Sequence, residues 1–371
     1  MKNLKQTGNR PEDAIAASCH NLIILDESGS MHPFVYDTIL GCNQTLATIH
    51  STQHTDPHTR QFVSIYCFST NLNDSRYIIE NAPVDTVKNI SPTHYRPGGL
   101  TALNDAIGYT CERLYRSIKD DKNATAVVTI ITDGGENSST DYSLERVKAL
   151  IERLKELGWV FSFIGANIDA EATSRSYSID SSFQFEQTTE GFQEMWEAER
   201  NSRYRHQERL CRIRKADYDS EEERRHAMAM LNEGYFREFN RVTPEIVTTL
   251  RRNEVFVFGS SINGAHSGGA ARVAVKRFGA IMGKGEGPQG QSYAIPTTGV
   301  SSQAIKHYVS EFVRYADKHA ELNFFVTPIG CGVAGYTDEQ IAPLFAPCAS
   351  LSNVALPQSF WAVLQKMGIF M

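Results

Sequence analysis

Short apolar runs that end in polar residues constrain the fold of this chain more than any other feature. Their length and apolar character are typical of strands buried in a sheet, and they predict strands at 21–26, 62–68, 126–133 and 159–164. Between the last two, apolar residues recur at spacings of three and four over 144–157, which predicts an amphipathic helix. Gly158 follows directly and suits the end of that helix.

Strands that alternate with helices predict a mostly parallel sheet covered on both faces, a doubly wound α/β fold. Ligands of such sheets bind where the strands end. A second, smaller α/β unit is expected further on, because strand-like runs recur at 254–259, 292–296, 323–327 and 353–357, with a helical pattern at 304–319.

Length and charge patterning divide the chain. At roughly 100–200 residues per domain, 371 residues make about two or three domains. We expect a polar tail at 1–17, a first domain at 18–200, a charged helical connector at 201–245 and a second domain at 246–371. In the connector a basic stretch at 200–215 precedes an acidic one at 217–223. These charges predict a solvated helix in which they pair, with an RNA- or partner-binding arm as the alternative.

Composition excludes several classes of protein. Hydrophobic residues are 41% of the chain and charged residues 22%, which argues for a globular protein with a real core. No apolar run approaches the ~18 residues that span a bilayer, and residues 1–12 are polar, so we expect neither a membrane span nor a secretory leader. The seven cysteines contain no C-x-x-C pair, which argues for a reducing, cytoplasmic location. The net charge of −6 argues against a nucleic-acid-binding surface that spans the whole chain, and leaves a local basic patch as the alternative.

Hydroxyl and carboxyl side chains gather at three predicted loops. Asp26, Ser28 and Ser30 form a D-x-S-x-S pattern at the end of the first strand. Thr101 follows a Pro-Gly-Gly turn, and Asp133 ends the second strong strand. Oxygen ligands of this kind suit Mg²⁺, Mn²⁺ or Ca²⁺ rather than zinc. Together they predict a metal site, whereas each loop alone would also fit an ordinary turn.

The order D-x-S-x-S, T-A-L-x-D-A-I and T-D-G-x-E-N over about residues 18–200 resembles a von Willebrand factor A domain. The resemblance implies a metal-ion-dependent adhesion site with Ser28, Ser30 and Thr101 as hydroxyl ligands and with Asp26 and Asp133 acting directly or through water. It implies Mg²⁺ (or Mn²⁺ or Ca²⁺) and a protein partner that presents an Asp or Glu to the metal. Elsewhere in this domain the histidines read as surface residues, with a zinc pair at His54 and His58 as a weaker alternative.

Glycine-rich loops follow two strands of the second unit. Gly268 and Gly269 lie where a helix is expected to begin, and a second loop runs over 328–336. Backbone N–H groups at such loops can face an anion, so the pair predicts a diphosphate site. The alternative is that the glycines only make tight turns.

The stretch from about 250 to 371 resembles a macrodomain, an ADP-ribose-binding module, and also a group of uncharacterised phage-borne proteins. The resemblance implies an ADP-ribose-type ligand held by Gly259, Asn263, His266, Gly268, Gly269, Gly330, Cys331, Gly332, Val333, Ala334, Gly335 and Tyr336. Ala270, Ala271 and Ala334 stand where hydrolytic relatives carry carboxylates. We therefore expect metal-dependent recognition coupled to ligand binding, with an ADP-ribosyl hydrolase or phosphoesterase as the alternative.

Overall fold

The computed structural model describes residues 17–370 except 232 and 333, so residues 1–16 of the expected tail at 1–17, and Val333, lie outside the described residues. The chain divides into two compact units. The first contains the described residues up to Gln207 together with Gly234–Phe236, and the second contains Glu208–Glu233 and the residues from Arg237 on. The helix α5 (Thr189–Lys215) belongs to the first unit up to Gln207.

A six-stranded sheet in the order β3-β2-β1-β4-β5-β6 forms the centre of the first unit, as far as the structure describes it. Its strands are β1 (Ala17–Asp26), β2 (Thr59–Phe68), β3 (Arg76–Pro83), β4 (Ala124–Thr132), β5 (Val160–Gly165) and β6 (Ser182–Gln184). All neighbours pair in parallel except β3, which runs antiparallel to β2 at one edge. The mostly parallel α/β sheet expected from the sequence is thus confirmed.

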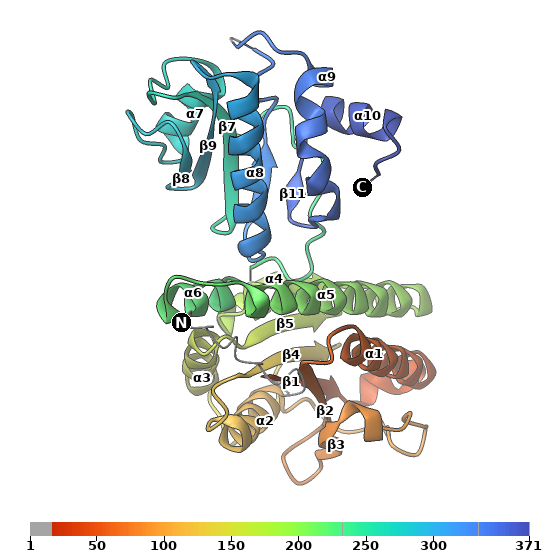
Figure 1. The fold of residues 1–371 in the computed structure, drawn as a ribbon. Coiled ribbons are helices and arrows are strands. Elements are labelled where there is room, and N and C mark those ends of the chain that lie inside the picture. Colours follow the sequence, from red (N-terminus) through yellow and green to blue (C-terminus); the bar gives the residue numbers. More distant parts are fainter. Residues whose placement is uncertain (1–16, 232, 333, 371) are drawn as a thin grey trace, which may run out of the picture. The chain divides into compact units, whose positions relative to one another are not determined.

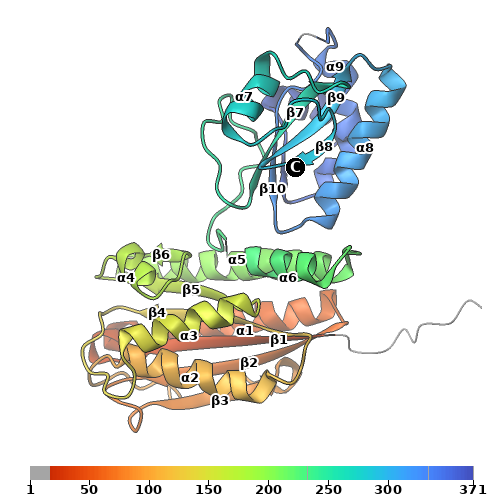
Figure 2. The same cartoon turned by 90° about the vertical axis from the view of Figure 1, so that its left-hand side faces the viewer.

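Helices cover both faces of this sheet (Figures 1 and 2). They are α1 (Val35–Thr55), α2 (Leu103–Ile118), α3 (Leu144–Glu156), α4 (Ala170–Ser176) and the first part of α5, with the short 3₁₀ segments η1 (Gly29–Phe34) and η2 (Val84–Thr86). Alternate residues of β1 point to opposite faces. Leu22 and Ile24 pack with α2 and α3, whereas Ile23 and Leu25 pack with α1 and α5. The continuous apolar runs are therefore buried on both sides.

A buried ion pair replaces the solvated charges expected for part of the connector. Arg203 and Glu199, one turn apart on α5, have no solvent exposure, and Arg203 Nη2 lies 2.6 Å from Glu199 Oε1. Arg203 also donates to Asn21 Oδ1 on β1 and to Thr129 Oγ1 on β4. The basic side chain is buried because α5 crosses the sheet there, a contact that charge patterning along the chain does not reveal.

The second unit has a five-stranded sheet in the order β11-β10-β7-β9-β8 within the described residues. Its elements are α6 (Glu221–Met230), β7 (Glu254–Ser261), α7 (Gly269–Arg277), β8 (Gly287–Gln289), β9 (Ser292–Thr298), α8 (Ser302–Lys318), β10 (Asn323–Val326), α9 (Asp338–Ile341), η3 (Ala342–Ser350), β11 (Val354–Ala355) and α10 (Gln358–Lys366). On one face Val255 and Val257 pack against α8, η3 and α10. On the other, Phe256 and Phe258 pack against α7. Figure 2 shows α7 and α8 on opposite sides of this sheet. This unit is therefore mixed α/β as well.

Candidate functional site

Three loops of the first unit meet at the carboxyl ends of β1 and β4. The loop after β1 carries Ser28 and Ser30, whose hydroxyls both donate to Asp133 Oδ1 at the end of β4, over 3.4 and 2.8 Å. The two serine hydroxyls lie 3.1 Å apart. Adjacent parallel strands end at the same edge of a sheet, so residues more than 100 positions apart in sequence come together. The structure thus brings the predicted ligands of the first loop, Ser28 and Ser30, into contact with the predicted ligand Asp133.

Thr101 joins the same cluster through the loop that follows β4. Its amide donates to Asn137 Oδ1 over 2.9 Å, and the Asn137 amide donates back to the Thr101 carbonyl over 3.1 Å. A Cβ placed on Gly134 would lie 3.6 Å from Thr101 Oγ1, which puts this hydroxyl beside the loop that begins at Asp133. All five predicted ligand residues therefore lie at the end of β1 or on loops that touch one another.

The acidic residues inside the two longer motifs hold the loops in place. Asp105, on α2, accepts hydrogen bonds from the amides of Thr140, Asp141 and Tyr142 over 2.8–2.9 Å. Glu136 accepts from the Asn104 amide and from the amides of Ser138 and Ser139. A carboxylate that accepts several amide N–H groups fixes the path of a loop. These two side chains are thus positioning groups, which leaves the serines, Thr101 and the two aspartates facing the loop junction.

The carboxylates at this junction are buried, and no basic side chain of the described residues forms an ion pair with either of them. Asp26 is fully buried, and its hydrogen-bond partners among the described residues, the Ser28 amide and the Thr132 hydroxyl, are both uncharged. Burial, with a smaller contribution from the nearby Asp133 charge, raises the pKa of Asp26 to about 6, against the lowering effect of these hydrogen bonds. Burial also raises the pKa of Asp133. Two carboxylates held this way favour a cation.

Oxygen donors dominate this set, and that chemistry fits a hard divalent ion such as Mg²⁺, Mn²⁺ or Ca²⁺. Asp26 and Asp133 are the charged members of this set. Their two negative charges do not exceed the two positive charges of a divalent ion. Sequence reasoning missed two neighbours of the cluster. Thr132 orients Asp26, and Gln187 Nε2 donates to Asp133 Oδ2 over 2.5 Å. Gln187 lies in the segment between β6 and α5, which carries no recognisable motif.

Glu27 does not belong to the cluster, although it lies between two predicted ligands. Arg76 on β3 donates to both oxygens of Glu27, over 2.5 and 2.9 Å, and the Arg96 amide donates to the same carboxylate. Tyr95 places its hydroxyl 2.7 Å from the Asp26 carbonyl. These contacts anchor the loop after β1 to the segment before Thr101, which supports the geometry of the junction.

The second glycine loop of the second unit passes close to β7. A Cβ on Gly259, in β7, would lie 3.4 Å from the Gly330 amide nitrogen. Gly268 caps α7 without a side-chain hydrogen bond, and a Cβ there or at Gly332 would meet no other atom within 4 Å. His266 is buried, its Nε2 lies 2.9 Å from the Lys284 carbonyl oxygen, and its Nδ1 has no partner among the described residues. The first glycine loop thus offers open space in front of a helix start that no side chain caps.

Three of the other expected ligand residues have structural roles. The Asn263 amide oxygen accepts from the Ser261 hydroxyl over 2.7 Å, within a local turn. Tyr336 packs against the core of its unit. Burial, together with the hydrogen bond and the charge of Asp338, raises the pKa of the Cys331 thiol to about 12. Cys331 is therefore a neutral thiol at physiological pH, and a reactive thiolate is not expected there.

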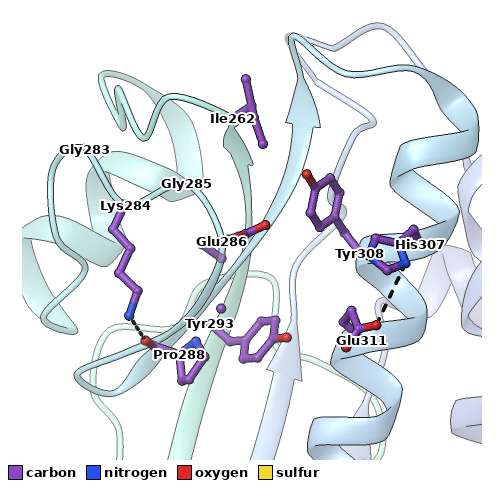
Figure 3. Close-up of a pocket in the computed structure, with 12 residues that line it drawn as sticks. Ile262, Gly283, Lys284, Gly285, Glu286, Pro288, Tyr293, His307, Tyr308 and Glu311 are labelled. Carbon is purple, nitrogen blue, oxygen red and sulfur yellow. Dashed lines mark hydrogen bonds and ion pairs between the residues drawn. The ribbon is translucent and has the colours of Figure 1, made fainter.

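A separate cavity of about 770 Å³ lies between the β8–β9 hairpin and α8 (Figure 3). Tyr293, Tyr308 and Glu311 line it, with Lys284 turned away to donate to the Pro288 carbonyl over 2.6 Å. Its described lining residues include none of those expected to bind a diphosphate. The cavity and the glycine loops are therefore different surfaces of the second unit.

Comparison with known proteins assigns the first unit. Residues 22–195 match the family model of the von Willebrand factor type A domain. With the sheet order and the three loops described above, this stretch is a von Willebrand factor type A (vWA) domain, and the resemblance seen in the sequence is confirmed for it. VWA domains mediate protein–protein interactions and commonly bind a divalent metal, which makes recognition the class of function for this unit.

Solved structures are similar over about half of the chain. PilB minor pilin from Streptococcus sanguinis is 12% identical with a TM-score of 0.36, and the match covers 53% of this chain and 63% of PilB. SpaC pilus adhesin from Lactobacillus rhamnosus GG is 11% identical with a TM-score of 0.41, over 53% of this chain and 31% of that one. Manganese-loaded TRAP protein from Plasmodium vivax is 14% identical with a TM-score of 0.33, over 50% of this chain and 72% of that one. No curated protein matches the chain.

No helix among the described residues is long and apolar enough to cross a membrane.

Proposed function

We propose that the vWA domain of this protein recognises a protein partner through a divalent cation, with Asp26, Ser28, Ser30, Thr101 and Asp133 as the residues that hold the ion directly or through water. The observation that carries this proposal is the pair of buried carboxylates, Asp26 and Asp133, at a junction of three loops with uncharged hydrogen-bond partners. A bound cation supplies the positive charge that this junction lacks. An Asp or Glu of the partner is the group that such a cation attracts.

Metal binding is the first test of this proposal. We expect Mg²⁺ to raise the thermal midpoint of the full chain, because it would bind the folded state. A ligand present at 100 times its Kd stabilises the folded state by about 2.7 kcal/mol. Asp26→Asn and Ser30→Ala should each remove most of this shift, measured by differential scanning fluorimetry in Mg²⁺ and in EDTA. Ser138→Ala is the matched control, since Ser138 lies in the loop after Asp133 and its hydroxyl has no partner among the described residues. An undiminished Mg²⁺ shift in both variants would place the ion elsewhere.

For the second unit we propose binding of an ADP-ribose-type ligand, with the diphosphate at the first glycine loop. What favours it is the uncapped start of α7 at Gly268, next to the buried His266 with an unpartnered Nδ1. Free amides at a helix N-terminus attract phosphate oxygens, and a missing side chain lets the phosphate approach. Ala270, Ala271 and Ala334 offer no carboxylate to activate water, so we propose binding rather than hydrolysis.

Calorimetry with ADP-ribose and the full chain tests this second proposal. Gly268→Glu and Gly332→Glu place negative charge and bulk where the phosphates would lie, so each should weaken binding by at least about tenfold, a loss of about 1.4 kcal/mol. Gly268 is a better position than Gly269, whose φ of +53° would strain any side chain. Gly135→Glu, also in open space but in the first unit, is the control. Absence of wild-type binding at millimolar ADP-ribose would leave only the α/β fold of this unit.

A further inference from the structure

Three exposed side chains outside the loop junction lie together where α1 packs against η2. His50 and His54 lie on α1, and Asp85 lies in η2. Each residue offers one ligand atom, and these three atoms all lie within 4.8 Å of one another. His50 Nε2 is 3.5 Å from Asp85 Oδ1, and the two imidazole rings have centroids 4.7 Å apart in an edge-on arrangement. Two imidazoles and a carboxylate therefore share one small volume.

Helix geometry explains why this pair of histidines, and not the pair considered from the sequence, meets. Residues four apart on a helix lie on the same side, one turn above the other. His50 and His54 both lie within α1, which ends at Thr55. His58 lies in the turn that follows and is not part of the cluster in the region that the structure describes. His54 and His58 are four residues apart in the sequence, but they do not lie on one helix, so this spacing does not bring them together.

The backbone under these ligands is held by the core. Ile49 and Val84, which directly precede His50 and Asp85, are buried in the same apolar cluster. Asn43 of α1 donates to the Ile90 carbonyl over 3.0 Å and accepts from the Ile90 amide over 2.8 Å, so the segment after η2 is tied to the helix in both directions. The three ligands thus need only side-chain rotation to converge on an ion.

We propose that His50, His54 and Asp85 form a second metal site, which binds Zn²⁺ or a related late first-row divalent ion and leaves a fourth position open. Imidazole nitrogen suits Zn²⁺, Ni²⁺ and Cu²⁺, whereas Mg²⁺ and Ca²⁺ prefer oxygen ligands. Three protein ligands with an open position is the arrangement of an accessible zinc site, and the exposure of His50 and Asp85 leaves that position open to water or to another molecule. The two metal sites of the first unit then differ in the ion that they select.

Calorimetric titration of ZnCl₂ into the full chain, in buffer that contains Mg²⁺, tests this site. We expect one Zn²⁺ per chain, and affinity lowered by about tenfold or more in His50→Ala, His54→Ala and Asp85→Ala, since even groups that only support a ligand contribute that much. His58→Ala is the matched control, an exposed histidine close to the cluster in sequence. Ser30→Ala separates this site from the one at the loop junction. Both controls should bind Zn²⁺ as the wild type does.

Substitution by Co²⁺ gives an independent readout, because the strength of its visible absorption distinguishes four-coordinate from six-coordinate binding. We expect a four-coordinate spectrum that His54→Ala abolishes and His58→Ala preserves. The substitutions are on exposed side chains, so the thermal midpoint in EDTA should stay at the wild-type value. Either a wild-type chain that takes up no Zn²⁺, or three cluster variants with wild-type affinity, would overturn the proposal.

Discussion

Replacing Arg203 by methionine should lower the free energy of unfolding by about 3–5 kcal/mol, the cost of removing one partner of a buried ion pair. Glu199 would then be a fully buried carboxyl group without its basic partner, with Thr129 left as a neutral donor to its Oε1. The other carboxylate oxygen, Oε2, already has no hydrogen-bond partner among the described residues. Urea unfolding followed by circular dichroism measures the change.

The double variant Glu199→Leu with Arg203→Met should recover most of that loss, because replacing a whole buried pair by apolar residues is often neutral or stabilising. Arg200→Met is the matched control on the same helix. Arg200 donates one hydrogen bond to Gln44 at the surface, so its replacement should change stability by no more than about 0.5 kcal/mol. A small effect of Arg203→Met alone would show that water reaches Glu199 and that the pair is not isolated from solvent.

The second large effect is expected at Gly41, where α1 meets the indole of Trp196. A Cβ on Gly41 would lie 2.2–2.3 Å from three ring atoms, and Trp196 is only 2% exposed. Gly41→Ala should therefore destabilise the first unit by about 1–3 kcal/mol through overpacking. This loss should appear even though alanine favours a helix interior over glycine by about 1 kcal/mol.

The effect of Gly41→Ala on the free energy of unfolding should change sign when the indole is removed. In a Trp196→Leu background the ring is gone, so Gly41→Ala should stabilise the protein by up to about 1 kcal/mol, the helix-propensity gain alone. The coupling between the two positions, measured from a double-mutant cycle of urea unfolding, is the quantity of interest. If Gly41→Ala has the same effect in both backgrounds, the indole does not restrict this position.

The sequence predicted the elements whose signals are local. The runs at 21–26 and 126–133 correspond to β1 and β4, and the helix expected at 144–157 corresponds to α3. It did not indicate α1, because threonines and a glycine occupy positions on the buried side of that helix, including Thr38, Thr45 and Thr52. The amphipathic pattern is weak there, since what buries these residues is packing on the sheet rather than their own hydrophobicity.

The residue types of the candidate metal site were also readable in the sequence, because D-x-S-x-S and the later threonine and aspartate bring oxygen ligands to predicted strand ends. Only the tertiary structure decided which groups surround them. Gln187 reaches Asp133 across 54 positions, and Glu27 is drawn away from the junction by Arg76. His50, His54 and Asp85 meet because η2 packs on α1, and Arg203 is buried because α5 crosses the sheet. Contacts between distant segments depend on strand order and helix packing, and no local pattern encodes either.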